Sequence, residues 1–360
     1  MFVRCALICL AQHLDSFREQ TKSAKKEVLS RQDEWMELVQ KEKQAQVAPA
    51  EVNSTADSRY DTSQGPYDPG KIEVRFERQG KLGSGTYGTV YKVRERSTGT
   101  LYAQKTANNS DRRTEEILRR EVRIMQMLRH PHIATVQFGY FGESGSYSFV
   151  MLPVADCDLG KFMSDFGQGN SLATSKKVHL TYWFGCLISA LSFAHSKDIR
   201  HGDIKPGNIL IEGMQPHLTD FGCAEDPSNL DTSSSERTRT PGTAVYLPPE
   251  DFPCSLKADV FSLGCVFSEM LTVRQERTLQ EFRRYRCMEN CDYPYAFREN
   301  LDMVTQWLDD VTREANDLER LLKEQTLRML EPKVSKRVKA KDVKKALRAE
   351  EEMVFCNFCT

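Results

Sequence analysis

The spacing of hydrophobic residues changes character along the chain, from alternation near its first third to helical spacing beyond it. Apolar and polar side chains alternate over residues 72–76 and 90–93, between Gly-rich and Ser-Thr-Gly turns, which predicts β-strands. Residues 112–128 carry apolar positions every three or four residues, which predicts a helix. Helical spacing dominates from Leu159 onward, most clearly in residues 178–195, 258–271, 301–330 and 341–348. This order predicts an α+β protein with two unequal lobes, the smaller one built on an antiparallel sheet.

The first part of the chain has a different pattern. In residues 14–38, mostly apolar positions step alternately by three and four, which predicts an amphipathic helix with charged outer faces. We favour a single helix that lies on the main domain or is partly ordered, because Thr21 and Arg31 interrupt the apolar seam. A coiled coil that binds a helical partner or a second copy is the alternative. Residues 47–70 are rich in Pro, Gly, Ser, Thr and Asp, which is typical of a flexible linker.

Composition narrows the classes of function. The 360 residues include 50 Lys and Arg against 51 Asp and Glu, a formal net charge of −1, which excludes an extended basic surface for nucleic acid. No apolar run approaches the roughly 18 residues needed for a membrane span. The apolar first ten residues lack the basic start and the cleavage site of a secretory signal, so we expect none.

Eleven cysteines occur at irregular spacing in a chain long enough to fold without disulfides. This usage favours reduced thiols and a location in the cytoplasm or the nucleus. Two close pairs occur, Cys287 with Cys291 and Cys356 with Cys359. A zinc site needs four ligands, and neither pair has an evident partner pair or a nearby His. We therefore expect ordinary thiols at both.

Residues 83–90 form a Gly-x-Gly-x-x-Gly-x-Val run between two predicted strands. Glycine lets backbone amides approach phosphate oxygens without a clash at Cβ. The run is a weak signal by itself, because a plain hairpin also accounts for the glycines. A dinucleotide-binding fold would need a helix directly after them, where residues 90–93 have a strand pattern.

The next predicted strand, residues 101–105, ends in Lys105. A strand lysine is usually only solvated. Here the helix that follows offers Glu121, whose carboxylate could hold Lys105 against a polyphosphate. Glu115 and Glu116 are rival partners that lie a turn or more earlier in the helix.

A dense polar loop follows the helix that ends near residue 195. Asp203, Lys205 and Asn208 fall within six residues, so one short loop can aim a base, a cation and an amide at the same point. Twelve residues beyond Asn208, Asp220 leaves a strand-like segment and is followed by an aromatic residue and a glycine. Magnesium prefers oxygen ligands and takes only one or two from protein, which Asn208 and Asp220 could supply.

Together these motifs are similar to the signature set of the eukaryotic-type protein kinase family, of the Ser/Thr type. The resemblance covers about residues 73–348. Its motifs, in the family's order, are the Gly-rich run, Ala103-Gln104-Lys105, His201-Gly202-Asp203 with Asn208, Asp220-Phe221-Gly222, Pro248-Pro249-Glu250, Asp259-Val260-Phe261-Ser262-Leu263-Gly264, and Arg337.

The resemblance implies a two-lobed kinase domain over residues 71–350. Its expected divisions are a small lobe with hinge over 71–155 and a larger lobe over 156–350, flanked by a helical extension at 1–46, the linker at 47–70 and a tail at 351–360. The residues implied to bind Mg-ATP are Gly83, Ser84, Gly85, Thr86, Gly88, Val90, Ala103, Lys105, the gatekeeper Met151, the hinge residues Leu152 and Val154, Asn208, Leu210 and Asp220. Of these, Asn208 and Asp220 are the implied metal ligands.

The resemblance also implies the catalytic roles. Lys105 would contact the α- and β-phosphates and pair with Glu121. Asp203 would accept the proton of the attacking hydroxyl, and Lys205 would steady the transferred γ-phosphoryl group. Residues 242–246 and the lysine after Asp203 match the Ser/Thr type, so the expected substrate is a Ser or Thr hydroxyl of a protein.

One departure from the family pattern concerns regulation. Gly202 stands where the family usually has an arginine that pairs with a phosphate on the activation segment. We expect activity not to require phosphorylation through that arginine, although six hydroxyl residues lie in this segment: Thr232, Ser233, Ser234, Ser235, Thr238 and Thr240. Cys223 is expected to be a packed residue, and His195 and His201 to be structural.

Two other functions compete with the kinase. A pseudokinase would keep the fold and bind ATP or a partner without turnover, and Gly202 is the one hint of it. A scaffold would dimerise through residues 14–38 and bring the kinase domain along.

Overall fold

A computed structural model describes most of the chain beyond residue 74. The described residues within 75–96 and 101–359 belong to one compact unit. The predicted helix over 14–38 and the predicted linker over 47–70 lie outside the described residues. The described ranges are 75–142, 145–165, 174–224, 243–250, 255–287, 294–350 and 354–359.

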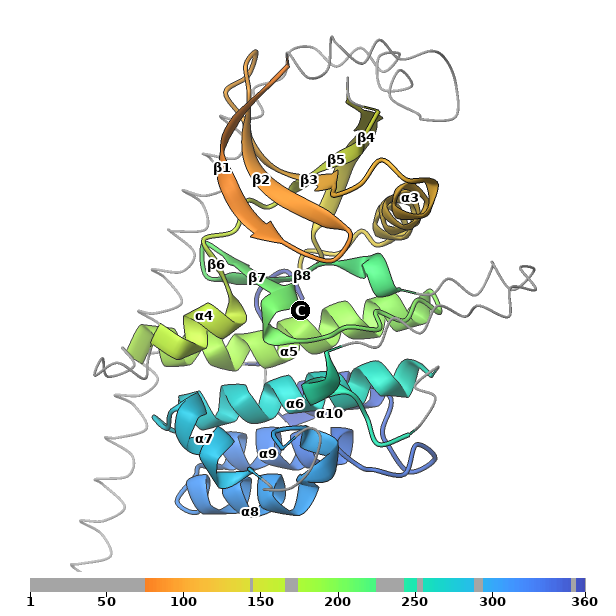
Figure 1. The fold of residues 1–360 in the computed structure, drawn as a ribbon. Helices are drawn as coiled ribbons and strands as arrows, with labels where there is room; N and C mark the ends of the chain where they lie inside the picture. Colours follow the sequence, from red (N-terminus) through yellow and green to blue (C-terminus); the bar gives the residue numbers. More distant parts are fainter. Residues whose placement is uncertain are drawn as a thin grey trace, which may run out of the picture. The chain divides into compact units, whose positions relative to one another are not determined.

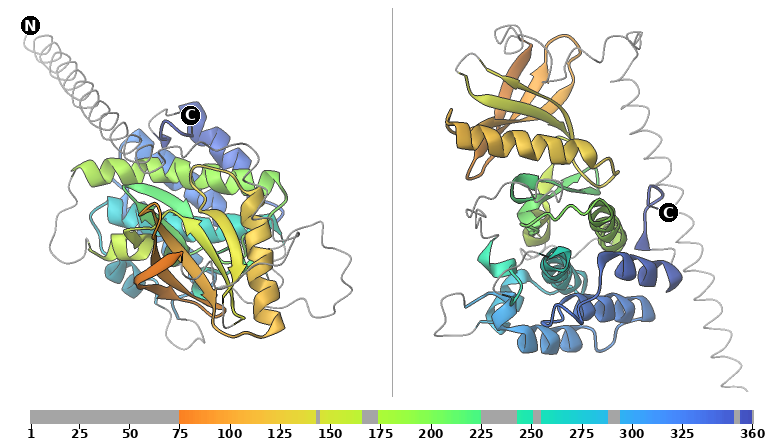
Figure 2. Two further views of the ribbon diagram at one scale, coloured as in Figure 1. Left: turned by 90° about the horizontal axis from the view of Figure 1, so that it is seen from above. Right: turned by 90° about the vertical axis from the view of Figure 1, so that its right-hand side faces the viewer.

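The smaller lobe is an antiparallel sheet covered by one helix (Figures 1 and 2). Its five strands, in the spatial order β1-β2-β3-β5-β4, are β1 (Phe76–Ser84), β2 (Gly88–Glu95), β3 (Leu101–Ala107), β5 (Tyr147–Leu152) and β4 (Thr135–Phe141). Helix α3 (Arg112–Met127) begins where Asp111 accepts a 2.9 Å hydrogen bond from the backbone of Thr114. Its apolar side chains Leu118, Val122 and Met125 are buried. The predicted antiparallel lobe is confirmed.

The larger lobe is mainly helical. Its helices are α4 (Leu159–Ser164), α5 (Thr174–Ser196), α6 (Leu256–Arg274), α7 (Leu279–Tyr285), α8 (Leu301–Val311), α9 (Asp317–Met329) and α10 (Ala340–Glu350). Every residue of α6 from Ala258 to Val273 is buried, including the charged residues Asp259 and Glu269, because the helix lies at the centre of the lobe. None of the described helices combines the length and the apolar character needed to cross a membrane.

A small second sheet lies at the top of this lobe, next to the first (Figure 1). Its strands, in the order β6-β7-β8, are β6 (Cys157–Asp158), β7 (Ile209–Glu212) and β8 (Gln215–Leu218). Leu218 of β8 also pairs with Ile133 from the segment that joins α3 to β4. The second sheet therefore links the polar loop around Asp203 to the smaller lobe.

The helical pattern over residues 301–330 forms two helices instead of one continuous helix. Helix α8 ends before Thr312, whose hydroxyl donates a 2.6 Å hydrogen bond to the carbonyl of Leu308. Helix α9 starts at a capping box in which Asn316 and Glu319 each accept a hydrogen bond from the other's backbone amide. The cap side chains separate two segments that share one hydrophobic period.

Two late segments fasten the larger lobe. Arg337 is fully buried and donates to both carboxylate oxygens of Glu250, at 2.8 and 2.9 Å. Residues 354–359 pack against α5, where a Cβ at Gly185 would overlap the carbonyl oxygen of Val354.

The prediction of ordinary thiols at Cys356 and Cys359 rests on the absence of a His near them. That premise is wrong. His132 and Cys186 lie beside them, and all four side chains are buried. Folding brings these residues together from segments that are far apart in the sequence.

Candidate active site

The predicted lysine and glutamate form a buried ion pair. Lys105 Nζ on β3 lies 2.8 Å from both carboxylate oxygens of Glu121 on α3, and also 2.8 Å from Oδ1 of Asp220. The rival partners are engaged elsewhere: Glu115 pairs with Arg119, and Glu116 pairs with Arg112 on the same helix. The structure therefore selects Glu121 and joins it, through Lys105, to the other lobe.

Burial and charge act against each other in this group. Burial favours a neutral Lys105, but Glu121 and Asp220 outweigh it and raise the pKa of Lys105 above its ordinary value. Burial raises the pKa of Glu121 to about 7, despite the lysine. Burial also opposes ionisation of Asp220, but the charge and the hydrogen bond of Lys105 outweigh burial and lower the pKa of that carboxyl. The two carboxyl groups thus differ in pKa: Asp220 is ionised at neutral pH, whereas Glu121 titrates close to neutral pH.

The Gly-rich turn joins β1 to β2 at the end of the sheet that faces β7 and β8 (Figure 1). Its backbone closes through a 2.8 Å hydrogen bond from Gly85 N–H to the carbonyl of Gly88. A Cβ at Gly88 would lie 3.0 Å from the carbonyl oxygen of Thr106 and 3.1 Å from Cγ of Lys105. Glycine at this position lets β2 pass close to the lysine.

Asn108 braces the same turn and was missed in the sequence. Its side-chain amide donates to the carbonyls of Gly85 and Thr86 at 2.9 and 3.3 Å, and its Oδ1 accepts from the hydroxyl of Thr89 at 2.8 Å. The only local signal is a polar residue directly after β3, which is common in turns.

The polar loop is built on His201 and Asp259. The carboxylate of Asp259, at the start of α6, accepts hydrogen bonds from the backbone amides of His201 and Gly202 at 2.7 and 2.9 Å. The imidazole of His201 is buried and lies 2.9 Å from the carbonyl of Thr219, while its Nδ1 accepts from the amide of Asp203 at 3.2 Å. His201 therefore supports the loop backbone, as expected.

These contacts orient the Asp203 carboxylate. Lys205 Nζ lies 2.7 Å from Oδ2 of Asp203 and 2.8 Å from the hydroxyl of Thr243. The backbone amide of Thr243 donates to Oδ1 of Asp203 at 2.8 Å. The Asn208 amide donates to the carbonyl and to Oδ2 of Asp203, at 2.8 and 3.1 Å. The structure thus brings together the carboxylate, the cation and the amide that the sequence placed in one loop.

Asp220 enters the site from the end of β8. The amide of Thr219 donates 3.0 Å to the carbonyl of Asn208, which places the two candidate metal ligands on adjoining backbone. Asp220 itself has φ 63°, in the left-handed region, and 44% of its side chain is exposed. Phe221 is buried against the His201 ring, with centroids 4.6 Å apart.

The residues expected around the nucleotide lie on neighbouring strands. Val90 is opposite Lys105 in the β2-β3 pair, and Ala103 is opposite Met151 in the β3-β5 pair. Leu210 lies on β7 of the larger lobe. The hinge residues Leu152 and Val154 are half-buried, and Met151 is buried.

Gly202 has a structural reason to be glycine in this chain. Its φ is 82°, and a Cβ would lie 2.7 Å from the carbonyl oxygen of Cys223. Any larger residue would strain the backbone and press on the turn that follows Asp220. The residues expected in the activation segment, from Thr232 to Thr240, lie outside the described part of the chain.

A five-stranded sheet joined to a helical lobe, with a Lys-Glu-Asp ion-pair group between them and an Asp-Lys-Asn loop, defines a protein kinase. The protein kinase domain model matches residues 76–347, and the chain belongs to this family. Membership implies ATP as a substrate and a divalent metal ion beside it.

Among curated proteins, the chain is similar to several protein kinases. It is 33% identical over 204 residues to the serine/threonine-protein kinase fused of Drosophila melanogaster, covering 55% of this chain and 24% of that protein. It is 32% identical over 206 residues to the Aurora kinase of Saccharomyces cerevisiae, covering 55% of this chain and 53% of that protein. It is 31% identical over 222 residues to cyclin-dependent kinase B2-1 of Arabidopsis thaliana, covering 57% and 69%. The matches thus span between a quarter and about two thirds of these relatives.

Proposed function

We propose that the protein is a serine/threonine kinase that transfers the γ-phosphoryl group of Mg-ATP to Ser or Thr hydroxyls of protein substrates. The observation that carries this proposal is the complete ion-pair group, in which Lys105 contacts both Glu121 and Asp220. Kinase turnover requires both the lysine–glutamate pair and the metal-binding aspartate in place.

The donor set fits a magnesium ion. Asn208 uses its amide nitrogen on Asp203, which leaves its oxygen for a metal, and Asp220 offers a partly exposed carboxylate. These are the hard oxygen ligands that magnesium prefers. A bound magnesium ion neutralises charge on the phosphate oxygens. In the proposal, Lys105 holds the α- and β-phosphates, and the amides of the Gly-rich turn cover them.

Asp203 is the proposed acceptor of the substrate hydroxyl proton. Its carboxylate is fixed by Lys205, Asn208 and the amide of Thr243, so little reorientation is needed when a hydroxyl arrives. Lys205 bridges Asp203 and Thr243 in this structure and is placed to steady the transferred group. The Lys205–Thr243 contact supports the Ser/Thr type over the tyrosine type.

The remaining proposals concern the setting of the enzyme. The free cysteines among the described residues, such as Cys157 and Cys223, support a reducing compartment, the cytoplasm or the nucleus. Self-association or a helical partner through residues 14–38 remains a prediction. Sedimentation of the full chain against a chain starting at Val52 tests it, and an identical monomer in both rejects it.

The activity is tested by transfer of labelled γ-phosphate from Mg-ATP to a generic basic protein and to the kinase itself. Label on Ser or Thr of either acceptor supports the proposal, provided that the Asp203→Asn variant gives none. Label found on Tyr alone rejects the Ser/Thr type.

A further inference from the structure

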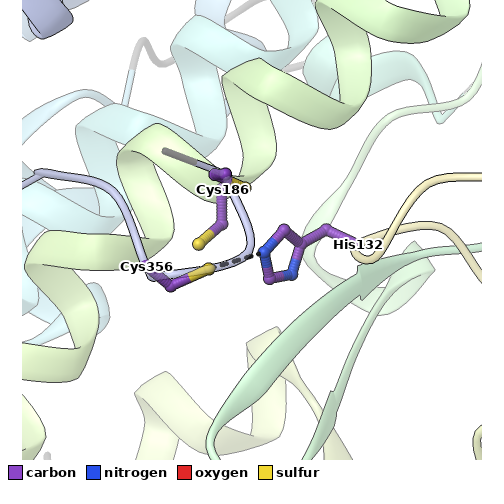
Figure 3. Close-up of side chains that lie close together, drawn as sticks. His132, Cys186 and Cys356 are labelled. Carbon is purple, nitrogen blue, oxygen red and sulfur yellow. Dashed lines mark hydrogen bonds between the residues drawn. The ribbon is translucent and has the colours of Figure 1, made fainter.

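Four buried metal-binding side chains meet outside the active site. They are His132, from the segment between α3 and β4, Cys186, from the middle of α5, and Cys356 with Cys359, from the segment after α10. Figure 3 shows His132, Cys186 and Cys356. Their exposed fractions lie between 0% and 5%. The one imidazole nitrogen and the three sulfur atoms that they offer all lie within 4.8 Å of one another.

This geometry is close to that of a tetrahedral zinc site. Zinc–sulfur bonds of about 2.3 Å place tetrahedral ligand atoms roughly 3.8 Å apart. Nε2 of His132 already lies 3.1 Å from Sγ of Cys356 (Figure 3). Shifts of about 1 Å in side chains therefore suffice to centre four ligands on one ion.

The surroundings orient the histidine for this role. Nδ1 of His132 lies 2.9 Å from the carbonyl oxygen of Pro216, so this nitrogen carries the proton and donates it. The lone pair of Nε2 is then directed at the thiols. Metal-binding histidines are usually held in this way by a carbonyl or carboxylate on the second nitrogen.

The C-terminal segment is also held in position. The amide of Cys359 donates 2.9 Å to the carbonyl of Cys356, which closes a tight turn between the two sulfur ligands. Arg348 of α10 donates to the carbonyl of Cys359 and stacks on Phe355. Its positive charge offsets the net charge of −1 that three thiolates and one histidine leave around Zn²⁺. Gly185, next to Cys186, leaves room for this segment against α5.

We propose that His132, Cys186, Cys356 and Cys359 form a structural zinc site that ties the C-terminal segment to α5 and to the α3–β4 segment. Binding replaces three thiol protons by one Zn²⁺ ion and moves no electrons. Protein side chains fill all four coordination positions of the proposed zinc ion, and all four are buried. This is typical of a structural zinc ion, because a catalytic zinc ion keeps one position open for water or substrate. Soft thiolate ligands favour zinc over magnesium or calcium.

The site is connected to the active site through the backbone. The carbonyl of His132 accepts 2.9 Å from the amide of Leu218, and the amide of Ala134 donates 2.9 Å to the carbonyl of Leu218. Leu218 ends β8, two residues before Asp220. A metal ion on His132 would thus hold the strand that positions Asp220.

The test measures zinc in the full chain, expressed without a histidine tag and purified with a thiol reductant. We expect one zinc ion per chain for the wild type. Cys186→Ala and the double variant Cys356→Ser/Cys359→Ser should lower zinc affinity by more than about 100-fold, since loss of a ligand exceeds the roughly 10- to 100-fold effect of an outer partner. Cys265→Ala is the matched control, because Cys265 is equally buried in a helix but lies outside the cluster.

A second measurement does not depend on whether the variants fold. Wild-type protein in which Co²⁺ replaces the metal should show the visible absorption of a tetrahedral thiolate site, and a chelator should lower its melting temperature. The proposal is overturned by wild-type protein that contains no zinc and takes up no Co²⁺. It is also overturned by ligand variants that retain full zinc, or by a Cys356–Cys359 disulfide in the native protein.

Discussion

Gly202 and Cys223 are in close backbone contact: a Cβ at Gly202 would lie 2.7 Å from the carbonyl oxygen of Cys223. The residue before the proposed catalytic base is thus coupled to the turn that follows Asp220. An arginine in this place would need another backbone conformation. The left-handed backbone at position 202 favours glycine, and this explains why the family's usual arginine is absent there.

The first prediction concerns this contact. Gly202→Ala should lower the free energy of unfolding by about 1–3 kcal/mol, because alanine is strained at φ 82° and its Cβ meets Cys223. Gly207→Ala in the same loop is the control, since a Cβ there meets nothing within 4 Å. Urea unfolding of the two variants measures the difference. Equal stability in both would mean that Gly202 is not constrained.

The same geometry predicts how the activation segment acts. Replacing its six Ser and Thr residues by Ala should leave activity within about threefold of the wild type, because the arginine that reads such a phosphate is absent. The assay is phosphotransfer on protein shown to be folded by circular dichroism. Complete loss of activity with the fold intact would contradict this prediction.

Glu121 gives a prediction for activity and for pH. Glu121→Gln should lower phosphotransfer by about 100-fold, because Lys105 loses the charge that positions it. Glu116→Gln, which removes an exposed charge from the same helix, is the control. Wild-type activity should also fall as the pH drops through about 7, where Glu121 gains a proton.

Ionisation of Glu121 favours activity but lowers the stability of the fold. Its pKa of about 7 in the folded protein lies above the ordinary value of 4.5, so the folded state binds more protons between these pH values. Ionised Glu121 therefore costs stability, and the free energy of unfolding falls as the pH rises from about 4.5 to 7. Glu121→Gln should remove this slope, which denaturant titrations at several pH values can measure. A slope that persists in the variant would contradict the account.

Asp259 behaves in the reverse way. Burial opposes its ionisation, but the hydrogen bond from His195 and the loop amides lower its pKa below the ordinary value. A lowered pKa stabilises the fold above the unfolded value near 4, and this stability is lost as the pH falls further. Asp259→Asn should therefore cost about 2–4 kcal/mol at neutral pH.

The pH dependence distinguishes this account of Asp259 from a simple packing defect. The stability difference between wild type and Asp259→Asn should be constant above about pH 5 and shrink below about 4. Asp309→Asn, at an exposed site on α8 paired with Lys323, should change stability by less than about 1 kcal/mol at any pH. A difference for Asp259→Asn that is the same at pH 3 and pH 7 would contradict the assigned role.

Residues of the candidate site that lie in short motifs were predictable from the sequence, because spacing alone brings them together. Asp203, Lys205 and Asn208 share one loop, and strand and helix order places Lys105 near Glu121. The contact of Lys105 with Asp220 joins residues 115 positions apart. The family resemblance implied that both residues face the nucleotide, but it did not predict their contact.

Other features have no local signature. His132 and Cys356 are 224 positions apart, so no spacing rule connects them, and each alone resembles an ordinary core residue. Asn108 binds carbonyls of the Gly-rich turn from the far end of the next hairpin. The break at Thr312 was hidden because α8 and α9 continue the same apolar period across their caps.

The most direct test of the central claim separates chemistry from nucleotide binding. Phosphotransfer from labelled Mg-ATP and affinity for ATP are measured together for the wild type, Asp203→Asn and Lys105→Met. The kinase account predicts that only the wild type labels Ser or Thr, that Asp203→Asn binds ATP with unchanged affinity, and that Lys105→Met binds it more weakly. A wild type that binds ATP but labels neither a basic protein nor itself would contradict the account and favour a pseudokinase.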